Sequence, residues 1–286
     1  MPNSQLSDVK LAILGAGNMG QAILAGALSA GVAANNITVT TADESAKAKL
    51  IEKYGIEVAE NNAVAVEYAD LVILAVKPYQ VSEVLKEISN ESVPGSLRRY
   101  VRLEPDAVVV SVAVGLDLAA LAKDLPAGQP VVRAMPNTPA MVSRGITALS
   151  PGAGVTSPQL ELAKSVLAGS GSVIVVPEKY QPAVGAISGS GPAYVAYFID
   201  ALIEAGVHQG LPRDIATALA VETFEGSAAM LRVTGDHPAV AREKVTSPGG
   251  TTAAALGELD NSGVRAAINR AVAAAIRRTK EIQAEG

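Results

Sequence analysis

Two stretches far apart in the chain combine glycine with small polar residues and carry no charged side chain: residues 15–20 and residues 245–252. Glycine accepts positive φ angles and lets the backbone come close to a ligand, so such stretches can turn their N–H groups toward an anion. The second stretch holds two glycines, one proline and four hydroxyl side chains. A linker between two helices is the alternative for it, and its composition alone leaves both interpretations open.

The first stretch stands in a more specific context. An apolar run at residues 9–14 precedes it and predicts a buried strand, and apolar positions at helical spacing follow it. A strand, the pattern G-x-G-x-x-G and a helix in this order favour dinucleotide binding over a plain glycine-rich turn. Gly15 permits the tight turn, Gly17 admits a pyrophosphate, and Gly20 lets the helix lie close to the strand. The predicted cofactor-binding residues of this loop are Gly15, Ala16, Gly17, Asn18, Met19 and Gly20.

The end of the second predicted strand bears on the choice of cofactor. Residues 37–41 form this strand, which ends at Thr40 and Thr41, with Asp43 two residues later. An NAD site usually places a carboxylate here for the ribose 2′-hydroxyl, whereas hydroxyl groups without an adjacent carboxylate tolerate a 2′-phosphate. Asp43 could still reach the ribose, and no arginine stands here to bind a phosphate. We predict NADPH as the cofactor, with NADH as the alternative.

Strands and helices alternate up to Pro177 and predict a Rossmann-like, doubly wound parallel sheet, extended at one edge. The charged stretch 90–106 is expected to be a surface insertion. Lys77 follows an apolar strand and would either face a ligand or cap the next turn. Further strands are expected at 56–58, 70–76, 107–113, 131–135, 145–149 and 173–176, and helices at 44–54, 61–68, 78–89, 116–125 and 158–168.

After Pro177 the chain is expected to be all helical, which predicts a dinucleotide-binding domain at 1–177 and a helical domain at 178–286. Helices are expected at 178–187, from Ser190 onward, and at 212–232, 238–244, 253–259 and 262–283. This half is poor in bulky apolar residues. Its apolar faces could close against a second copy, so we predict a dimer through these helices, with one self-contained bundle as the alternative.

Composition excludes several other classes of function. The net charge of −5 argues against a nucleic-acid partner, and the lack of cysteine excludes disulfides and thiolate chemistry. With only two histidines, no metal site is predicted. We expect no membrane span, because no apolar run reaches about 18 residues. No secretory signal is visible at the start, so a cytoplasmic protein is expected.

The side chains available for chemistry are mainly hydroxyls. No histidine is paired in sequence with a carboxylate at a strand end, so oxidation of an alcohol is not favoured, and His208 and His237 are expected at the surface or at helix ends. Hydroxyl and backbone N–H groups suit a substrate that has a carboxylate to bind and a C=N bond to reduce. Such a bond can be reduced as a protonated iminium, which asks less of a protein acid than a ketone does. A bound nicotinamide would supply the hydride.

Five motifs, standing in this order, resemble those of the pyrroline-5-carboxylate reductase family. The glycine fingerprint is shared with many dehydrogenases, whereas the last two motifs are far more specific. Similarity extends from about Val9 to Gln283, and the stretch 90–106 looks longer than is usual in the family. The motifs span residues 15–20, 75–78, 135–139, 188–194 and 245–252.

The resemblance implies the last step of proline biosynthesis, in which NAD(P)H reduces 1-pyrroline-5-carboxylate to L-proline. It assigns the substrate carboxylate to the late glycine-rich loop and the catalytic hydroxyl, near the ring nitrogen, to Thr252. It places Asn62 at the adenosine ribose. The substrate-binding residues that it implies are Ser247, Gly249, Gly250, Thr251 and Thr252, and those beside the nicotinamide half of the cofactor are Ala75, Val76, Lys77, Pro78, Met135 and Asn137.

The resemblance also implies a homodimer with interleaved C-terminal helices, in which one subunit's helical domain completes the other's site, and further assembly into decamers. Two other functions are weighed against this one. Similar two-domain reductases act on β-hydroxyacids or on other cyclic imines, which a panel of substrates would distinguish. A non-enzymatic NADP-binding protein would bind cofactor without turnover.

Overall fold

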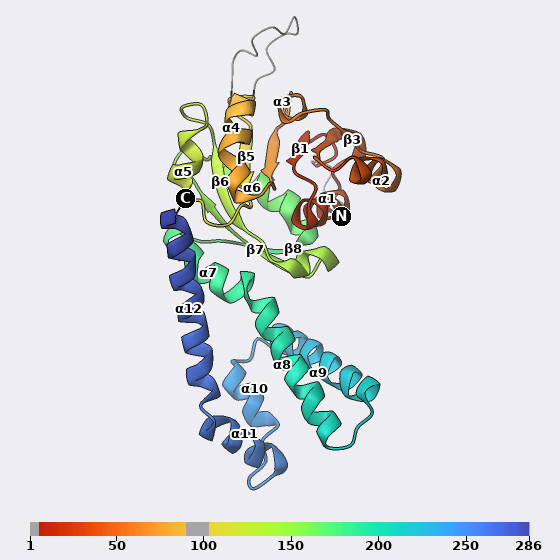
Figure 1. Ribbon diagram of the computed structural model, residues 1–286, viewed down its shortest axis with the longest axis vertical. Coiled ribbons are helices and arrows are strands. Elements are labelled where there is room, and N and C mark those ends of the chain that lie inside the picture. The colour runs from red at the N-terminus through yellow and green to blue at the C-terminus, as the bar shows by residue number, and fades with distance from the viewer. Residues whose placement is uncertain (1–5, 90–102, 286) are drawn as a thin grey trace, which may run out of the picture. The chain divides into compact units, whose positions relative to one another are not determined.

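The computed structural model describes residues 6–89 and 103–285 (Figure 1). These residues form two compact units. The first runs to Gly189 and includes the end of the chain from Ile276, and the second is Ser190–Ala275. Among the described residues, none of the helices is both long and apolar enough to cross a membrane.

The first unit is built on one eight-stranded sheet with the strand order β3-β2-β1-β4-β5-β6-β7-β8. Strands β1 to β6 are parallel, which confirms the predicted doubly wound sheet. The strands are β1 (Leu11–Leu14), β2 (Ile37–Thr40), β3 (Glu57–Val58), β4 (Leu71–Leu74), β5 (Val108–Ser111), β6 (Val131–Met135), β7 (Gly145–Pro151) and β8 (Gly171–Val175).

The extension at the edge of the sheet is not parallel throughout. β7 runs antiparallel to β6, and β8 then runs parallel to β7. Only a short connection with the 3-10 helix η3 (Thr138–Val142) joins β6 to β7. A parallel crossover needs about a dozen residues or more, so this connection reverses the chain direction instead.

Helices cover both faces of the sheet. Side chains alternate along β1, so that Leu11 and Ile13 join one buried cluster while Ala12 and Leu14 join the other. The first cluster includes apolar residues of α1 (Asn18–Ala30), α2 (Glu44–Tyr54) and α6 (Ser157–Leu167). The second includes those of α3 (Asn62–Ala65), α4 (Val81–Ser89) and α5 (Leu118–Lys123). The strands are therefore buried on both faces, as their nearly continuous apolar runs predict.

The glycines of α1 fix its distance from the rest of the unit. Helix η4 (Ala168–Ser170) lies against α1 so closely that a Cβ atom on Gly169 would be 1.8 Å from the carbonyl oxygen of Gly26. A Cβ atom on Gly26 would in turn be 2.7 Å from the backbone nitrogen of Ser170. Because backbone meets backbone here, this contact holds α1, and with it the glycine loop that precedes α1, in place.

The second unit is helical and has a small core of its own. Ile203 of α8 and Ala216 and Ala220 of α9 are buried together, with Ile199 and Val207 packed beside them. From residue 178 onward the described helices, in order, are η5 (Glu178–Tyr180), α7 (Gln181–Val184), η6 (Gly185–Gly189), α8 (Gly191–His208), α9 (Arg213–Thr234), α10 (Pro238–Lys244), α11 (Thr251–Asn261) and α12 (Val264–Glu285).

Several local predictions differ from the structure. The predicted helix 178–187 is divided into η5, α7 and η6. α3 has four residues instead of the predicted span 61–68, because the chain leaves the helix and Tyr68 takes a left-handed φ of 62° before β4. Of the predicted surface insertion at 90–106, residues 90–102 lie outside the described residues, and at its end Leu103 is buried in the core. Ser190 precedes α8 as predicted, but its side chain makes no capping hydrogen bond.

An ion pair ties β6 to the start of the helical half of the chain. Arg133 of β6 is buried, and its Nη1 lies 3.3 Å from Oε1 of Glu178. The same carboxylate oxygen accepts the backbone N–H of Leu118, the first residue of α5, at 2.7 Å. A buried guanidinium requires such a partner, so Glu178 is fixed to β6 and α5.

Candidate active site

The glycine loop divides its three glycines between two tasks. Gly15 has a φ of 100°, and a Cβ atom there would lie 2.8 Å from the carbonyl oxygen of Ala75. A Cβ atom on Gly20 would lie 2.0 Å from the carbonyl oxygen of Gly15. By contrast, a Cβ atom on Gly17 would meet nothing within 4 Å. Gly15 and Gly20 are therefore needed by the fold itself, whereas the missing side chain at Gly17 leaves open space for a ligand.

The start of α1 supplies the donors that a pyrophosphate needs. Gly17 is the N-cap residue and makes no side-chain capping bond, so the first N–H groups of the helix have no partner within it. Gly17 and Asn18 are exposed. Ala16 is buried, its carbonyl oxygen accepts the side-chain N–H of Gln21 at 2.8 Å, and Met19 packs on the core. Ala16 and Met19 thus fix the inner side of the loop, and Gly17 and Asn18 leave its outer side exposed, which fits a bound dinucleotide phosphate.

At the end of β2 the hydroxyl of Thr40 is already engaged. Thr40 is buried, and its hydroxyl donates to Oδ1 of Asn62 at 2.7 Å and accepts the backbone N–H of Gly15 at 3.3 Å. The hydroxyl of Thr41 accepts the backbone N–H of Asp43 at 3.2 Å. The structure therefore brings Thr40 and Asn62 together beside the glycine loop, while Thr41 belongs to the following turn.

Asp43 is turned onto the start of α2. Its Oδ1 accepts the hydroxyl of Ser45 at 2.7 Å, the backbone N–H of Ser45 at 2.9 Å and that of Ala46 at 3.3 Å. The hydrogen bond from the Ser45 side chain, followed by those from the two backbone N–H groups, lowers the pKa of Asp43 below its usual value. Asp43 therefore stays a carboxylate at neutral pH, and its contribution to stability is lost only as the pH falls through this lowered pKa.

The turn after β4 lies next to the glycine loop. The backbone N–H of Ala75 donates to the carbonyl oxygen of Leu14 at 2.8 Å. Val76 packs on the second core cluster. Lys77 is exposed, and its backbone N–H donates to Oε1 of Gln80 at 3.2 Å as Pro78 begins a 3-10 helix. The backbone of Lys77 thus caps the turn, and its exposed side chain is still available to a ligand.

The turn after β6 is held by Asn137. Its Oδ1 accepts the backbone N–H of Ile146 in β7 at 2.9 Å, which leaves the amide nitrogen as the group that could face a ligand. The side chain of Met135 points toward the 188–194 motif, since a Cβ atom on Gly189 would lie 2.7 Å from the Met135 methyl group. The predicted nicotinamide-side residues therefore stand at the carboxyl ends of β4 and β6, the ligand edge of such sheets.

The late glycine-rich loop joins α10 to α11 in the second unit. The backbone N–H of Gly250 donates to the carbonyl oxygen of Ser247 at 3.0 Å, and Gly249 has a φ of 68°, so Ser247–Gly250 is a tight turn with Pro248 and Gly249 at its centre. Gly250 is the N-cap of α11 and makes no side-chain capping bond. The N–H groups of Thr251 and Thr252 therefore begin α11 without partners inside the helix.

The hydroxyls of this loop differ in their engagement. Thr246 donates its hydroxyl to the carbonyl oxygen of Arg242 at 2.7 Å. Within the part of the chain that the structure describes, the Thr252 hydroxyl has no hydrogen-bond partner, although its residue is half-buried. A half-buried free hydroxyl beside unpaired N–H groups can bind both an anion and a nitrogen next to it.

Both histidines lie at helix ends, as predicted. His208 is the last residue of α8, and His237 caps α10 by accepting the backbone N–H of Ala239 on Nδ1 at 3.2 Å. Over residues 6–89 and 103–285, the carboxylate and imidazole side chains form no cluster suited to a metal ion.

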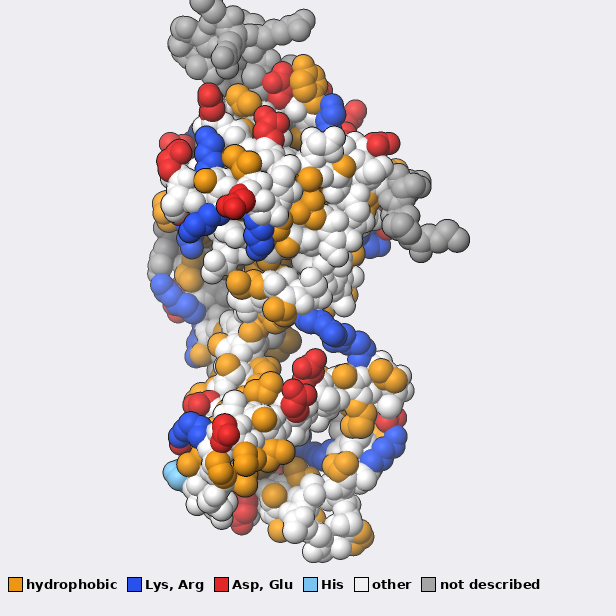
Figure 2. Space-filling view, turned by 90° about the vertical axis from the view of Figure 1, so that its right-hand side faces the viewer, with side chains coloured by type: hydrophobic (Ala, Val, Ile, Leu, Met, Phe, Trp, Pro, Cys, Tyr) orange, Lys and Arg blue, Asp and Glu red, His pale blue; other side chains and the backbone are white. Residues whose placement is uncertain are grey.

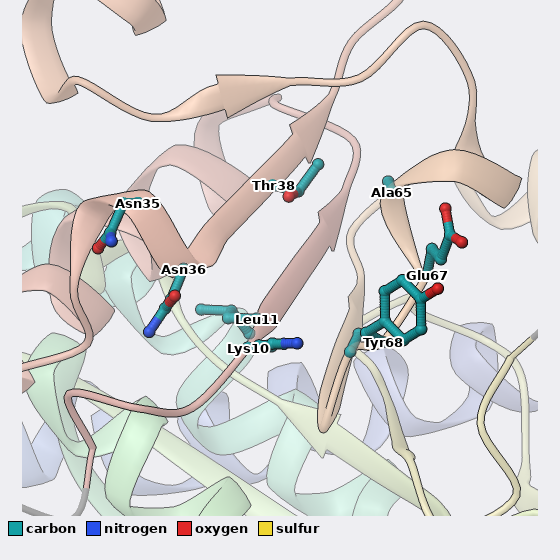
Figure 3. Close-up of a pocket in the computed structure, with 9 residues that line it drawn as sticks. Lys10, Leu11, Asn35, Asn36, Thr38, Ala65, Glu67 and Tyr68 are labelled. Atoms are coloured by element: carbon teal, nitrogen blue, oxygen red, sulfur yellow. The ribbon is translucent and has the colours of Figure 1, made fainter.

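An open hollow of about 160 Å³ lies at the amino ends of β1, β2 and β4 (Figure 3). Lys10, Asn36 and Tyr68 contribute to its lining, and the Lys10 amine lies 5.1 Å from the centre of the Tyr68 ring. These residues precede β1, β2 and β4, whereas the glycine loop follows β1. The hollow is therefore separate from the carboxyl ends of the strands, where the candidate dinucleotide site lies.

Comparison with known proteins agrees with this geometry. Residues 178–282 match the family model described as pyrroline-5-carboxylate reductase dimerisation, and residues 10–115 match the one described as NADP oxidoreductase coenzyme F420-dependent. Over 272 residues the chain is 43% identical to pyrroline-5-carboxylate reductase of Corynebacterium melassecola, covering 95% of this chain and 98% of that protein. The chain belongs to the pyrroline-5-carboxylate reductase family.

Solved structures of pyrroline-5-carboxylate reductases share the fold over nearly the whole chain. The enzyme of Coxiella burnetii has 35% sequence identity and a TM-score of 0.87, covering 96% of this chain and 98% of that one. The enzyme of Plasmodium falciparum, solved with NADP bound, has 26% identity and a TM-score of 0.83, covering 97% and 99%.

One polar residue near the candidate dinucleotide site, Glu87, belongs to none of the motifs that carry the reductase resemblance. Glu87 of α4 accepts the backbone N–H of Asn62 at 3.0 Å and its side-chain nitrogen at 2.6 Å. The two residues are 25 positions apart, and their contact depends on how α3 and α4 pack. No local pattern in the sequence points to this carboxylate.

Proposed function

We propose that this chain is a pyrroline-5-carboxylate reductase of the cytoplasm, which reduces the C=N bond of 1-pyrroline-5-carboxylate to form L-proline in the last step of proline biosynthesis. NADPH is the proposed hydride donor, with NADH as the alternative. One observation carries the proposal: α1 and α11 both begin at an N-cap glycine without a side-chain cap. Two helix starts with unpaired N–H groups match a cofactor phosphate and a substrate carboxylate.

The first unit would hold the cofactor. The start of α1 would bind the pyrophosphate. Thr40, at the end of β2, and Asn62, which accepts its hydroxyl, would lie at the adenosine ribose. Ala75 to Pro78, Met135 and Asn137 would border the nicotinamide, which supplies the hydride when bound. Thr41 is assigned a supporting role in the turn that follows β2.

The loop before α11 would hold the substrate carboxylate. The N–H of Gly250 is already donated to Ser247, so the donors that the loop offers are the N–H groups of Gly249, Thr251 and Thr252 and the hydroxyl of Ser247. The positive end of α11 adds a favourable field for the anion. The Thr252 hydroxyl would hydrogen-bond the ring nitrogen and so orient the C=N bond for reduction.

The direct test follows the loss of NADPH absorbance with 1-pyrroline-5-carboxylate as substrate. The proposed function predicts turnover with NADPH, with NADH, or with both. Folded protein that turns over neither cofactor contradicts it. Turnover with a β-hydroxyacid or with another cyclic imine in preference to 1-pyrroline-5-carboxylate would change the proposed substrate and keep the reductase chemistry.

Replacing Thr252 by alanine is expected to lower kcat and leave the protein folded. The loss corresponds to a hydrogen bond that matters in the transition state, about 1–3 kcal/mol in the activation barrier. Thr246→Ala is the matched control, because the Thr246 hydroxyl is donated to the carbonyl oxygen of Arg242 in the last turn of α10. Steady-state kinetics of both variants separate the two positions, and a Thr252→Ala enzyme with unchanged kcat would remove Thr252 from the mechanism.

We further propose that the helices from residue 178 onward form a homodimer. Side chains of the helical unit that a single chain leaves exposed support this, and Figure 2 shows apolar groups gathered over these helices. On α8, Val195 is 46% exposed and Leu202 48%, although both lie on the apolar face of that helix. Full burial of an exposed side chain of this size contributes about 1.5–3 kcal/mol, so covering the exposed half of each would stabilise the dimer by roughly half of that.

Light scattering on the purified protein tests the dimer. One chain has a mass of 29.0 kDa, so a dimer is expected at twice this mass, and a decamer at ten times. A single species of monomer mass at micromolar concentration would contradict the dimer and favour a self-contained bundle. We also propose the domain division between residues 177 and 178, because the helices that would form the dimer begin at residue 178.

A further inference from the structure

A chain of hydrogen bonds runs from α4 to the glycine loop. The carboxylate of Glu87 accepts both the backbone N–H and the side-chain nitrogen of Asn62. Oδ1 of Asn62 accepts the hydroxyl of Thr40 at 2.7 Å, and the oxygen of that hydroxyl accepts the N–H of Gly15 at 3.3 Å. Three of these four residues stand where dinucleotide binding is proposed, and Glu87 is the fourth.

The carboxylate sets the direction of the two side-chain bonds in this chain, from Asn62 to Glu87 and from Thr40 to Asn62. An ionised carboxylate can only accept hydrogen bonds, so the nitrogen of the Asn62 amide must face Glu87 and its oxygen must face Thr40. Thr40 has one hydroxyl proton, which this arrangement commits to Asn62. The lone pairs of the Thr40 hydroxyl are then directed away from Asn62, and one of them accepts the N–H of Gly15, which also donates to the Thr40 carbonyl oxygen at 3.2 Å.

Asn62 depends on Glu87 more than a residue in a long helix would. α3 has only four residues, and a single helical turn is not stable in isolation. Asn62 is its first residue, and Glu87 binds both the backbone and the side chain of Asn62 at that start. Since α4 contributes Val84, Leu85 and Ile88 to the core, Glu87 is anchored on a rigid element.

We propose that Glu87 is a positioning residue for the adenosine end of the cofactor, acting through Asn62 and Thr40. The inference rests on the proposed dinucleotide binding at this edge of the sheet. Thr40 ends β2, where a dinucleotide fold holds the adenosine ribose. Glu87 therefore fixes the orientation of the amide and the hydroxyl that the ribose and its 2′ substituent would meet.

Glu87→Gln tests this with almost no change in shape. A glutamine side chain has one acceptor oxygen and one donor nitrogen, so it can accept only one of the two Asn62 N–H groups and places a donor against the other. The Asn62 amide then loses its fixed orientation. We expect the dissociation constant for NADPH to rise about tenfold, the size of one lost hydrogen bond to a charged group. We expect kcat at saturating cofactor to change less than twofold.

Titration of intrinsic NADPH fluorescence gives the dissociation constants of wild type, Glu87→Gln and the control Glu83→Gln, whose side chain is exposed on the same helix. Adenosine 2′,5′-bisphosphate and reduced nicotinamide mononucleotide probe the two ends of the cofactor separately. Glu87→Gln should weaken binding of the bisphosphate and leave the affinity for the mononucleotide unchanged. In a Thr40→Val background, Glu87→Gln should have a smaller effect, because the proposed action runs through Thr40.

The outcomes separate this inference from the function on which it rests. Wild type that binds neither NADPH nor NADH overturns the proposed function. Wild type that binds, with a Glu87→Gln variant of equal affinity and lower melting temperature, overturns the positioning role alone and leaves Glu87 a structural tie. If Glu87→Gln does not fold, Glu87→Asp is used for the same test. Aspartate keeps the charge, but its side chain is one methylene shorter, so the carboxylate lies farther from Asn62. Affinity equal to that of Glu83→Gln then overturns the inference.

Discussion

Replacing Gly17 by alanine is expected to weaken NADPH binding by about 100-fold while changing the free energy of unfolding by less than about 1 kcal/mol. The new methyl group would meet no protein atom within 4 Å, and the φ of −69° at Gly17 suits alanine. It would instead occupy the open side of the loop where the pyrophosphate is proposed to bind. Loss of two hydrogen bonds to a charged group corresponds to a change of this size.

Gly20 and Gly154 provide the comparison for this experiment. Gly20→Ala places a methyl group 2.0 Å from the carbonyl oxygen of Gly15, so both stability and cofactor affinity should fall. Gly154→Ala meets its nearest atom only at 3.7 Å and should change neither. Cofactor titration and urea unfolding on the same preparations give both quantities. Unchanged NADPH affinity in folded Gly17→Ala would show that Gly17 does not face the pyrophosphate.

Replacing Gly169 by alanine is expected to destabilise the protein by about 3 kcal/mol or more. The added methyl group would lie 1.8 Å from the carbonyl oxygen of Gly26 and 2.5 Å from its carbonyl carbon. Both atoms are backbone, so no side chain can rotate away, and α1 must shift against the sheet. Overpacking in a close-packed interior typically costs about 1–3 kcal/mol, and a contact with rigid backbone belongs at the upper end of that range or beyond it.

Urea unfolding measures this loss as a lower midpoint, with the slope of the transition unchanged if the unfolded state is the same. Gly154→Ala again serves as the control. If Gly169→Ala is not obtained folded, Gly26→Ala gives a milder version of the same contact, 2.7 Å from the nitrogen of Ser170. Midpoints equal to wild type for both variants would contradict the close packing of α1 against η4.

Features set by local chemistry could be predicted from the sequence. α2 spans Glu44–Tyr54 as predicted, because the Asp43 side chain caps its start and Gly55 ends it in a left-handed conformation. β6 spans Val131–Met135, as its apolar run predicts. The succession of strand, glycine loop and helix from β1 to α1 also follows the sequence, where the glycine pattern stands directly between an apolar run and apolar positions at helical spacing.

Features that depend on residues distant in the chain could not be predicted from the sequence. The orientation of β7 depends on the length of the connection from β6 and on which edge of the sheet is free. The charged surroundings of Leu103 conceal that it completes the core. At the site, the commitment of the Thr40 proton and the role of Glu87 depend on residues 22 and 25 positions from Asn62. The spacing of residues in the sequence predicts that the Thr40 hydroxyl lies at the end of β2, whereas tertiary packing determines the group to which it donates.

The small core of the helical unit has a thermodynamic consequence. Within Ser190–Ala275, all of which the structure describes, the buried apolar cluster consists of Ile203, Ala216 and Ala220. If the proposed dimer covers the rest, folding of this unit and association of two chains are one equilibrium, governed by mass action. The melting temperature is then a function of protein concentration. Dilution in the assay, as well as mutation, would determine how much enzyme is folded.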